Sequence, residues 1–171
     1  MQTWDAITAR RDVREFEDRP VAEADLVRIL EAGRRAPSSR NWQPWDYVLV
    51  TDREQLRELA TVWQGARHVA SSAATIAEVL PQSDDEGERE RAQFDLGQAT
   101  MAMQIAAADL GIGTGHSAVG DQDRARTILG VPSDRYVAHM VPLGYPADRP
   151  LKPIKQPDRR PFEEVVHRGA W

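Results

Sequence analysis

The chain has 171 residues, of which 41% are hydrophobic and 29% charged, and its formal net charge is −5. This length is enough for one domain with its own core, and the acidic balance argues against the basic face that nucleic-acid binding needs. The absence of cysteine excludes disulfides, thiolate metal sites and cysteine nucleophiles.

The predicted elements mix helices and strands without a regular repeat. They are helices over 4–9, 24–35, 52–62, 94–110 and 122–129, and strands over 46–50, 73–80 and 136–143. The charged block 82–91 predicts a solvated connection, and the proline-rich stretch 147–160 predicts an extended segment. This order indicates an α+β layer fold instead of a βαβ repeat.

Neither a membrane span nor a signal peptide is evident in the sequence. No apolar run reaches the length of a membrane-crossing helix, and the N-terminal residues lack a signal-peptide pattern. We therefore expect a cytoplasmic protein. The modest apolar fraction also fits a core that a second copy of the chain completes.

The first candidate site is a cluster of arginines near the N-terminus. Arg10, Arg11 and Arg14 lie within five residues. Guanidinium groups match the oxygens of a phosphate, and positions four apart would share a face of a helical turn. The alternative is a solvated basic helix end whose arginines pair with neighbouring carboxylates.

The second candidate is the polar segment 37–45, which follows a predicted helix and runs into a predicted strand. It contains two serines, an asparagine and a glutamine, whose hydroxyl and amide groups can address the heteroatoms of a planar ring. The alternative is a helix stop followed by a polar turn. Together, the two segments indicate a nucleotide-like cofactor.

Other kinds of site are unsupported. The glycine-rich stretch 111–115 follows a helix and lacks the lysine of a P-loop, so it predicts a helix end and a turn. No histidine has metal-ligand spacing, and His139 is expected in the core or at an interface. No Gly-x-Ser-x-Gly motif of a serine hydrolase occurs.

Taken in order along the chain, these features resemble the nitroreductase family of flavoproteins. The matching pieces are Arg10-Arg11-x-Val13-Arg14-x-Phe16, 26–32, Ala36-Pro37-Ser38-Ser39, Asn41-x-Gln43-Pro44-Trp45, Asp95-x-Gly97-x-Ala99, Leu110-Gly111-Ile112-Gly113, 128–132, 143–146 and 159–166. The resemblance therefore covers nearly the whole chain.

The resemblance implies a fold, a cofactor and a reaction. The fold would be α+β, with a central, mostly antiparallel sheet flanked by helices, in an intertwined homodimer. One domain would span 1–171, with an extended C-terminal arm from about residue 147. FMN would bind between the subunits, take a hydride from NAD(P)H at N5, and pass electrons to an electron-poor acceptor such as a nitroaromatic or a quinone.

The resemblance also implies which residues contact FMN. They are Arg10, Arg11, Arg14, Pro37, Ser38, Ser39, Asn41, Gln64, Gly120, Arg159 and Arg160. The first three arginines, joined by one of the last two, would hold the phosphate. Pro37, Ser38 and Ser39 would come from the other subunit and line the ring, with Asn41 nearby. Gly120 would lie near the polar edge of the ring, and Gln64 would supply a polar amide near the flavin. No catalytic side chain or metal is expected, because the flavin carries the chemistry.

The chain departs from the family pattern in two places. Asp12 stands where the family commonly has serine, and a carboxylate repels a phosphate unless a neighbouring arginine compensates it. The segment 82–93 is too short and too charged for the helical lid of larger members, which predicts an open flavin site.

Three alternatives to the oxidoreductase stay open at this point. The first is a non-catalytic flavin-binding or deazaflavin-binding protein of the same fold. The second is a structural dimer that has lost its cofactor. The third, suggested by the Arg-Arg-Asp-Val-Arg form at 10–14, is a flavin-destroying enzyme related to synthesis of the lower ligand of cobalamin.

Overall fold

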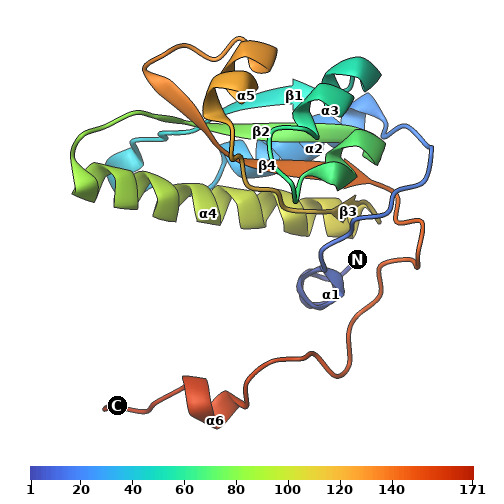
Figure 1. Ribbon diagram of the computed structural model, residues 1–171. Helices are drawn as coiled ribbons and strands as arrows, with labels where there is room; N and C mark the ends of the chain where they lie inside the picture. Colours follow the sequence, from blue (N-terminus) through green and yellow to red (C-terminus); the bar gives the residue numbers. More distant parts are fainter.

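The computed structural model describes residues 1–171 and contains one sheet with helices on both faces (Figure 1). In chain order, its elements are α1 (Thr3–Ala9), α2 (Glu23–Arg34), the 3-10 helix η1 (Ser39–Asn41), β1 (Asp46–Val50), α3 (Arg53–Leu59), the 3-10 helix η2 (Arg67–Ser71), β2 (Ala74–Pro81), α4 (Glu86–Asp109), β3 (Gly113–Thr114), α5 (Gln122–Leu129), β4 (Arg135–Gly144) and α6 (Phe162–Val165). None of these helices combines the length and the apolar character that crossing a membrane requires.

The sheet has four strands in the order β1-β2-β4-β3, and all neighbours are antiparallel. The central strand β2 is buried on both faces, which explains its nearly continuous apolar sequence. The α+β fold with a mostly antiparallel sheet is thereby confirmed. The short strand β3 was not predicted, because its two residues lie inside the glycine-rich stretch.

Helices cover the two faces of the sheet differently. On one face, α2 and α4 pack against a cluster that includes Ile29, Ile76 and Met103. On the other face, α3, η2 and α5 pack against a cluster that includes Leu56, Ala77 and Val137. The neighbouring residues Ile76 and Ala77 of β2 belong to opposite clusters, because successive side chains of a strand point to opposite faces of the sheet. Each face of the sheet therefore has its own core.

The charged block 82–91 does not form a connection throughout, and that prediction is wrong for residues 86–91. Helix α4 begins at Glu86, and the Asp85 carboxylate caps it by accepting the Glu88 N–H at 2.8 Å. Acidic side chains in a first turn are favourable near the positive end of the helix dipole. All of the residues 86–91 except the half-buried Gly87 stay exposed, so the block is the solvated start of a long helix and not a separate helical lid.

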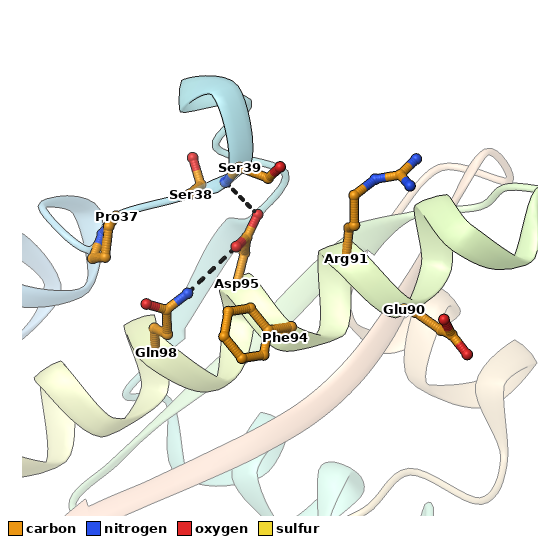
Figure 2. A pocket seen from close by; sticks show the side chains of 8 residues that line it. All are labelled: Pro37, Ser38, Ser39, Glu90, Arg91, Phe94, Asp95 and Gln98. Atoms are coloured by element: carbon orange, nitrogen blue, oxygen red, sulfur yellow. Dashed lines mark hydrogen bonds between the residues drawn. The ribbon is translucent and has the colours of Figure 1, made fainter. Parts of the chain in front are cut away.

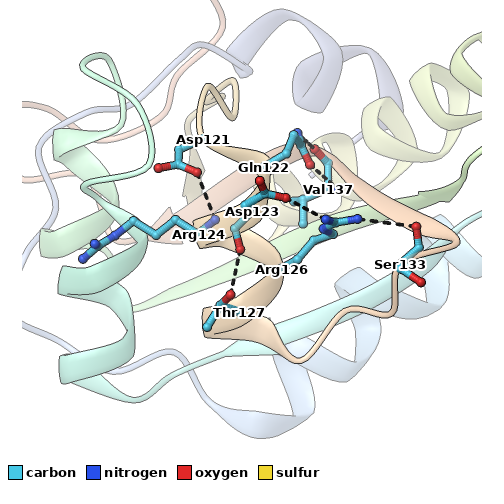
Figure 3. Close-up of polar contacts among 8 residues, drawn as sticks. All are labelled: Asp121, Gln122, Asp123, Arg124, Arg126, Thr127, Ser133 and Val137. Atoms are coloured by element: carbon cyan, nitrogen blue, oxygen red, sulfur yellow. Dashed lines mark hydrogen bonds and ion pairs between the residues drawn. The ribbon is translucent and has the colours of Figure 1, made fainter.

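Polar contacts attach α5 to β4 (Figure 3), and backbone hydrogen bonds attach the residues before α5 to the loop after α3. The Gln122 side chain donates to the Val137 carbonyl at 2.8 Å and accepts the Val137 N–H at 3.1 Å, as a neighbouring strand would. The Asp121 carboxylate caps α5 by accepting the Arg124 N–H. The Gly120 and Asp121 N–H groups both donate to the Val62 carbonyl, at 3.1 and 2.9 Å.

The chain after residue 147 leaves the body of the molecule as an arm (Figure 1). Its last backbone contact with the body is the Ile154 N–H donating to the Thr8 carbonyl of α1 at 3.0 Å. Residues 155–171 are all exposed, including the one-turn helix α6. The predicted extended stretch 147–160 contains no helix or strand.

Candidate functional site

The arginine segment is extended backbone that runs beside β3. Asp12 forms a bridge with Thr114, and the Val13 N–H donates to the Thr114 carbonyl at 2.9 Å. Helix α1 has ended at Ala9, so the shared helical turn expected for Arg10 and Arg14 is wrong. Val13 is fully buried, and the alternation of a strand exposes its neighbours Asp12 and Arg14.

Glycines allow this close approach of the segment to β3. A Cβ at Gly113 would lie 2.7 Å from Val13 Cγ2, and one at Gly115 would lie 2.7 Å from the Val13 carbonyl oxygen. The expected helix end is also present, because Gly111 follows α4 with a φ of +75°. The glycine-rich stretch therefore serves packing and a turn.

The three arginines of this segment have different partners. Arg10 donates from Nη2 to the Asp12 carboxylate at 2.8 Å. Arg11 donates from Nη2 to the Asp148 carboxylate at 2.7 Å and to the Arg149 carbonyl at 2.8 Å, at the base of the arm. Arg14 is exposed and makes no hydrogen bond or ion pair. Arg14 is thus the cation with its guanidinium free for a ligand.

Three histidines lie close to this segment. The rings of His116 and His139 meet edge to face, with centroids 5.1 Å apart, and both border a cavity of about 220 Å³ that Arg10 also lines. Burial is the main cause that lowers the pKa of each of these imidazoles and of His68, and the charge of Arg14 lowers the pKa of His68 further. No group of acidic, histidine or cysteine side chains is placed to hold a metal ion.

The second candidate segment lies against the N-terminal half of α4 (Figure 2). Three of its predicted residues line one hollow of about 510 Å³, together with side chains of α4; the lining residues are Pro37, Ser38, Ser39, Glu90, Arg91, Phe94, Asp95 and Gln98. The buried Asp95 carboxylate accepts the Ser39 N–H at 2.9 Å. The Ser38 Oγ accepts the Gln43 N–H at 2.9 Å, which leaves its hydroxyl hydrogen available to a ligand.

The backbone of this segment is strained. Arg40, Asn41 and Gln43 all have left-handed φ values, of 53°, 57° and 52°. Residues other than glycine adopt this region at a cost, and such strain collects at functional sites. The side chain of Gln43 donates to the Asn41 carbonyl at 3.0 Å, which helps to hold the conformation.

Gln64 and Gly120 lie together on the face of the sheet that carries α3 and α5. Gln64 borders a hollow of about 560 Å³ that Trp63 and Arg67 also line. A Cβ at Gly120 would collide with Trp63 Cε3, so Trp63 packs directly on this glycine. The Gly120 N–H already donates to the Val62 carbonyl, so its predicted approach to the ring edge stays a prediction.

The C-terminal arginines are not near the arginine segment of the same chain. Arg159 and Arg160 are exposed on the arm, beyond its last backbone contact with the body. Arg160 Nε pairs with the Glu164 carboxylate of α6 at 3.4 Å. Their role at a phosphate therefore stays a prediction that requires a second chain.

The two candidate halves border different faces of α4 within one chain. Phe94, Asp95 and Gln98 face the hollow of the second segment, whereas Gly97, Thr100 and Gln104 face the cavity lined by Arg10. At ~100° per residue, these two sets point roughly 130° apart around the helix axis. The arginine segment and the segment 37–41 therefore form two separate candidate half-sites within one chain.

Sequence reasoning missed several residues of these half-sites. Phe94 is 71% exposed and lines the same hollow as Ser38 and Ser39. A large apolar residue next to a charged stretch was the sequence feature that could have indicated its place at the site. Trp63 and Arg67 flank Gln64 in the sequence and border the same hollow. The three histidines come together from distant parts of the chain, so no local sequence pattern indicates that they are neighbours.

Comparison with known proteins gives similarity over almost the full length. The profile of the Nitroreductase family matches residues 7–74 and 62–145. The chain is 33% identical to an NADH dehydrogenase of Thermus thermophilus, over 95% of both chains. It is 30% identical to an oxygen-insensitive NADPH nitroreductase of Salmonella typhimurium, covering 99% of this chain and 74% of the relative.

A solved structure has the same fold. The NADPH:FMN oxidoreductase from Vibrio harveyi complexed with NAD⁺ superimposes with a TM-score of 0.83 at 26% sequence identity. The match covers 97% of this chain and 76% of that protein. The matched residues 7–74 include the arginine segment and the segment 37–45.

Proposed function

Because the chain belongs to the nitroreductase family, we propose that it is an NAD(P)H-dependent oxidoreductase that uses FMN. The observation that carries the proposal is the match of almost the whole chain to relatives described as NADPH nitroreductase and NADPH:FMN oxidoreductase. When bound, FMN would supply the redox chemistry, a hydride accepted from NAD(P)H and electrons passed to a nitroaromatic or quinone acceptor.

The residues present fit a phosphorylated flavin. Arg14 has an exposed guanidinium without a partner, and Arg10 lies in the same extended segment. The Ser38 hydroxyl has a free hydrogen, and Ser39 offers a hydroxyl without a partner. In this proposal the arginines bind the phosphate, and the hydroxyls donate to the ring.

We extend the proposal to a homodimer. The two half-sites lie on different faces of α4, so each site would combine one half from each chain. Trp4 and Ile7 of α1 and Met101 of α4 are large, exposed apolar residues that a second copy would cover. A cytoplasmic location stays a prediction from the sequence.

Purified protein tests the proposal directly. We expect flavin absorbance, FMN identified by mass, and bleaching of the absorbance when NADH or NADPH is added without oxygen. Bleaching followed by reoxidation with a quinone supports the proposed reaction. A yellow protein that neither nicotinamide bleaches supports the flavin-binding alternative, and a colourless protein that takes up no flavin contradicts the proposal.

The substitution Arg14→Ala tests the phosphate contact. We expect the dissociation constant of FMN to rise severalfold, by less than about tenfold, because a charge-assisted hydrogen bond to the phosphate is lost. Arg57→Ala is the matched control, since Arg57 is an exposed arginine of α3 without a hydrogen-bond partner. Equal FMN affinity in the two variants, measured by flavin fluorescence, would place the phosphate elsewhere.

A further inference from the structure

Three of the five candidate arginines for the phosphate already have carboxylate partners in their own chain. Arg10 pairs with Asp12 at 2.8 Å, Arg11 with Asp148 at 2.7 Å, and Arg160 with Glu164 at 3.4 Å. An anionic ligand that reaches these cations must therefore compete with carboxylates. The hydrogen bond from Arg11 also lowers the pKa of the Asp148 carboxyl, so this carboxyl stays ionised at neutral pH.

Asp12 is the competing carboxylate that lies inside the arginine segment itself. The side chains of Arg10 and Asp12 are 22% and 44% exposed, so a phosphate that contacts this guanidinium also meets the carboxylate. The bridge to Thr114 fixes the backbone of Asp12 beside β3. The backbone that carries the carboxylate is therefore held beside the Arg10 guanidinium, which donates to this carboxylate at 2.8 Å.

The neighbouring histidines do not neutralise the negative charge of the Asp12 carboxylate. Burial lowers the pKa of His116 and of His68, although the charge of Asp12 acts in the opposite direction on both. Both imidazoles are thus neutral at neutral pH, and the nearby positive charges are those of Arg10, Arg11 and Arg14. Of these three, only Arg10 donates to the Asp12 carboxylate, whereas Arg11 Nη1 donates to the Asp12 backbone carbonyl at 3.5 Å.

We propose that Asp12 determines which flavins the site accepts, because it offsets the charge of Arg10 and leaves only a weak preference for FMN over unphosphorylated riboflavin. This inference rests on the proposed flavin site. It assigns to the ring contacts, and not to the phosphate, most of the binding free energy. Riboflavin-type flavins are then ligands of nearly the same affinity as FMN.

The test compares FMN and riboflavin, which differ only in the phosphate, on apo-protein of the full chain. We expect wild-type dissociation constants that differ by less than about tenfold. Asp12→Asn removes the charge at nearly constant shape, and we expect it to tighten FMN binding by about tenfold and to leave riboflavin within about twofold. Asp12→Ser is a second variant with the same expectation, should the first fold poorly.

Glu15→Gln is the matched control for a charge change nearby. Glu15 is an exposed carboxylate of the same segment whose side chain has no partner, so we expect it to change neither dissociation constant beyond about twofold. Tightening of FMN alone in the Asp12 variants, absent in the control, supports the inference.

Two results would overturn it. Unchanged FMN affinity in both Asp12 variants contradicts the inference, and weaker FMN affinity assigns Asp12 instead to positioning Arg10 for the phosphate. In either case, FMN binding that remains sensitive to Arg14→Ala leaves the proposed function standing. A wild-type protein that binds neither flavin contradicts the proposed function, and the inference with it.

Discussion

Glu78 is a buried carboxyl in the central strand, on the face that packs against α4. Thr100 donates its hydroxyl to Glu78 Oε1 at 2.6 Å, whereas Oε2 is buried without a hydrogen-bond partner. Burial raises the pKa of this carboxyl from 4.5 to about 7, although the hydrogen bond from Thr100 acts in the opposite direction. Glu78 therefore binds its proton more tightly in the folded chain than in the unfolded chain.

This shift gives a stability prediction with a definite sign. The folded state binds more protons between pH 4.5 and about 7, so the contribution of Glu78 to stability is lost as pH rises through that window. We expect Glu78→Gln to raise the melting temperature by a few degrees at about pH 8, and to raise it less or lower it at about pH 5. The buried histidines make stability rise with pH near pH 6, which opposes the effect of Glu78. The difference in melting temperature between Glu78→Gln and the wild type is therefore the quantity to plot against pH.

Glu54→Gln is the control for this experiment, because Glu54 is exposed on α3 and its side chain makes no hydrogen bond or ion pair. Its melting temperature should follow that of the wild type across the same pH range. A pH-independent difference for Glu78→Gln would mean that the carboxyl is solvated in the folded protein.

Individual candidate residues were easier to identify in the sequence than the residues that they contact in the folded chain. The arginine segment and the serines are visible as local clusters of one chemistry. The pair of Arg11 and Asp148 joins positions 137 apart, and that of Ser39 and Asp95 joins positions 56 apart. No local pattern contains such pairs, because they depend on the packing of β3, the arm and α4.

At the scale of elements, α4 supports the strained segment after α2. Asp95 is 2% exposed and accepts both the Ser39 N–H and, at 3.4 Å, the Gln98 side-chain N–H. A buried acceptor of this kind restrains the backbone next to the non-glycine residues that have positive φ. We infer that the Asp95 carboxylate helps to hold residues 39–43 in this conformation.

Removing that acceptor should release the segment. We expect Asp95→Ala to lower the free energy of unfolding by about 1–3 kcal/mol, because the Ser39 N–H loses its partner in a partly buried place. Urea denaturation measures this change, and flavin affinity should fall as the serines lose their fixed positions. Asp95→Asn keeps an acceptor and should lose less than Asp95→Ala on both measurements; equal losses would assign the effect to charge alone.

The helices and strands could be predicted where the apolar periodicity extends over many residues. The prediction failed where an element is short or where its sequence is charged. The strands β1, β2 and β4 and the helices α2 and α5 follow from apolar patterns. Residues 86–91 carry no apolar stripe, so the pattern could not show that α4 starts there. The two-residue strand β3 and the 3-10 helices depend on neighbouring elements for their hydrogen bonds.

At the scale of the whole molecule, the exposed apolar residues of α1 and α4 support the proposed dimer. Met101 is 47% exposed on α4 and should be covered by the second chain. We expect Met101→Glu to shift the mass measured by light scattering from two chains toward one, because a buried unpaired charge is costly. Val27→Glu is the control, since Val27 is 54% exposed on α2 and lies outside the proposed surface.

A wild-type mass of one chain at all concentrations would contradict the dimer. A loss of the dimer in both variants would instead indicate a general effect of added negative charge. The expected pattern, loss in one variant only, locates the interface on α1 and α4.

The arm has a consequence for how the protein behaves on dilution. A one-turn helix is not stable alone, and nothing in its own chain covers residues 155–171. Among the basic residues of the arm, Lys155, Arg159 and Arg168 are not followed by proline, so trypsin can cleave after each of them once the backbone is accessible. Slower cleavage at these bonds as protein concentration rises would make proteolysis of the arm a direct measure of its docking on a second chain.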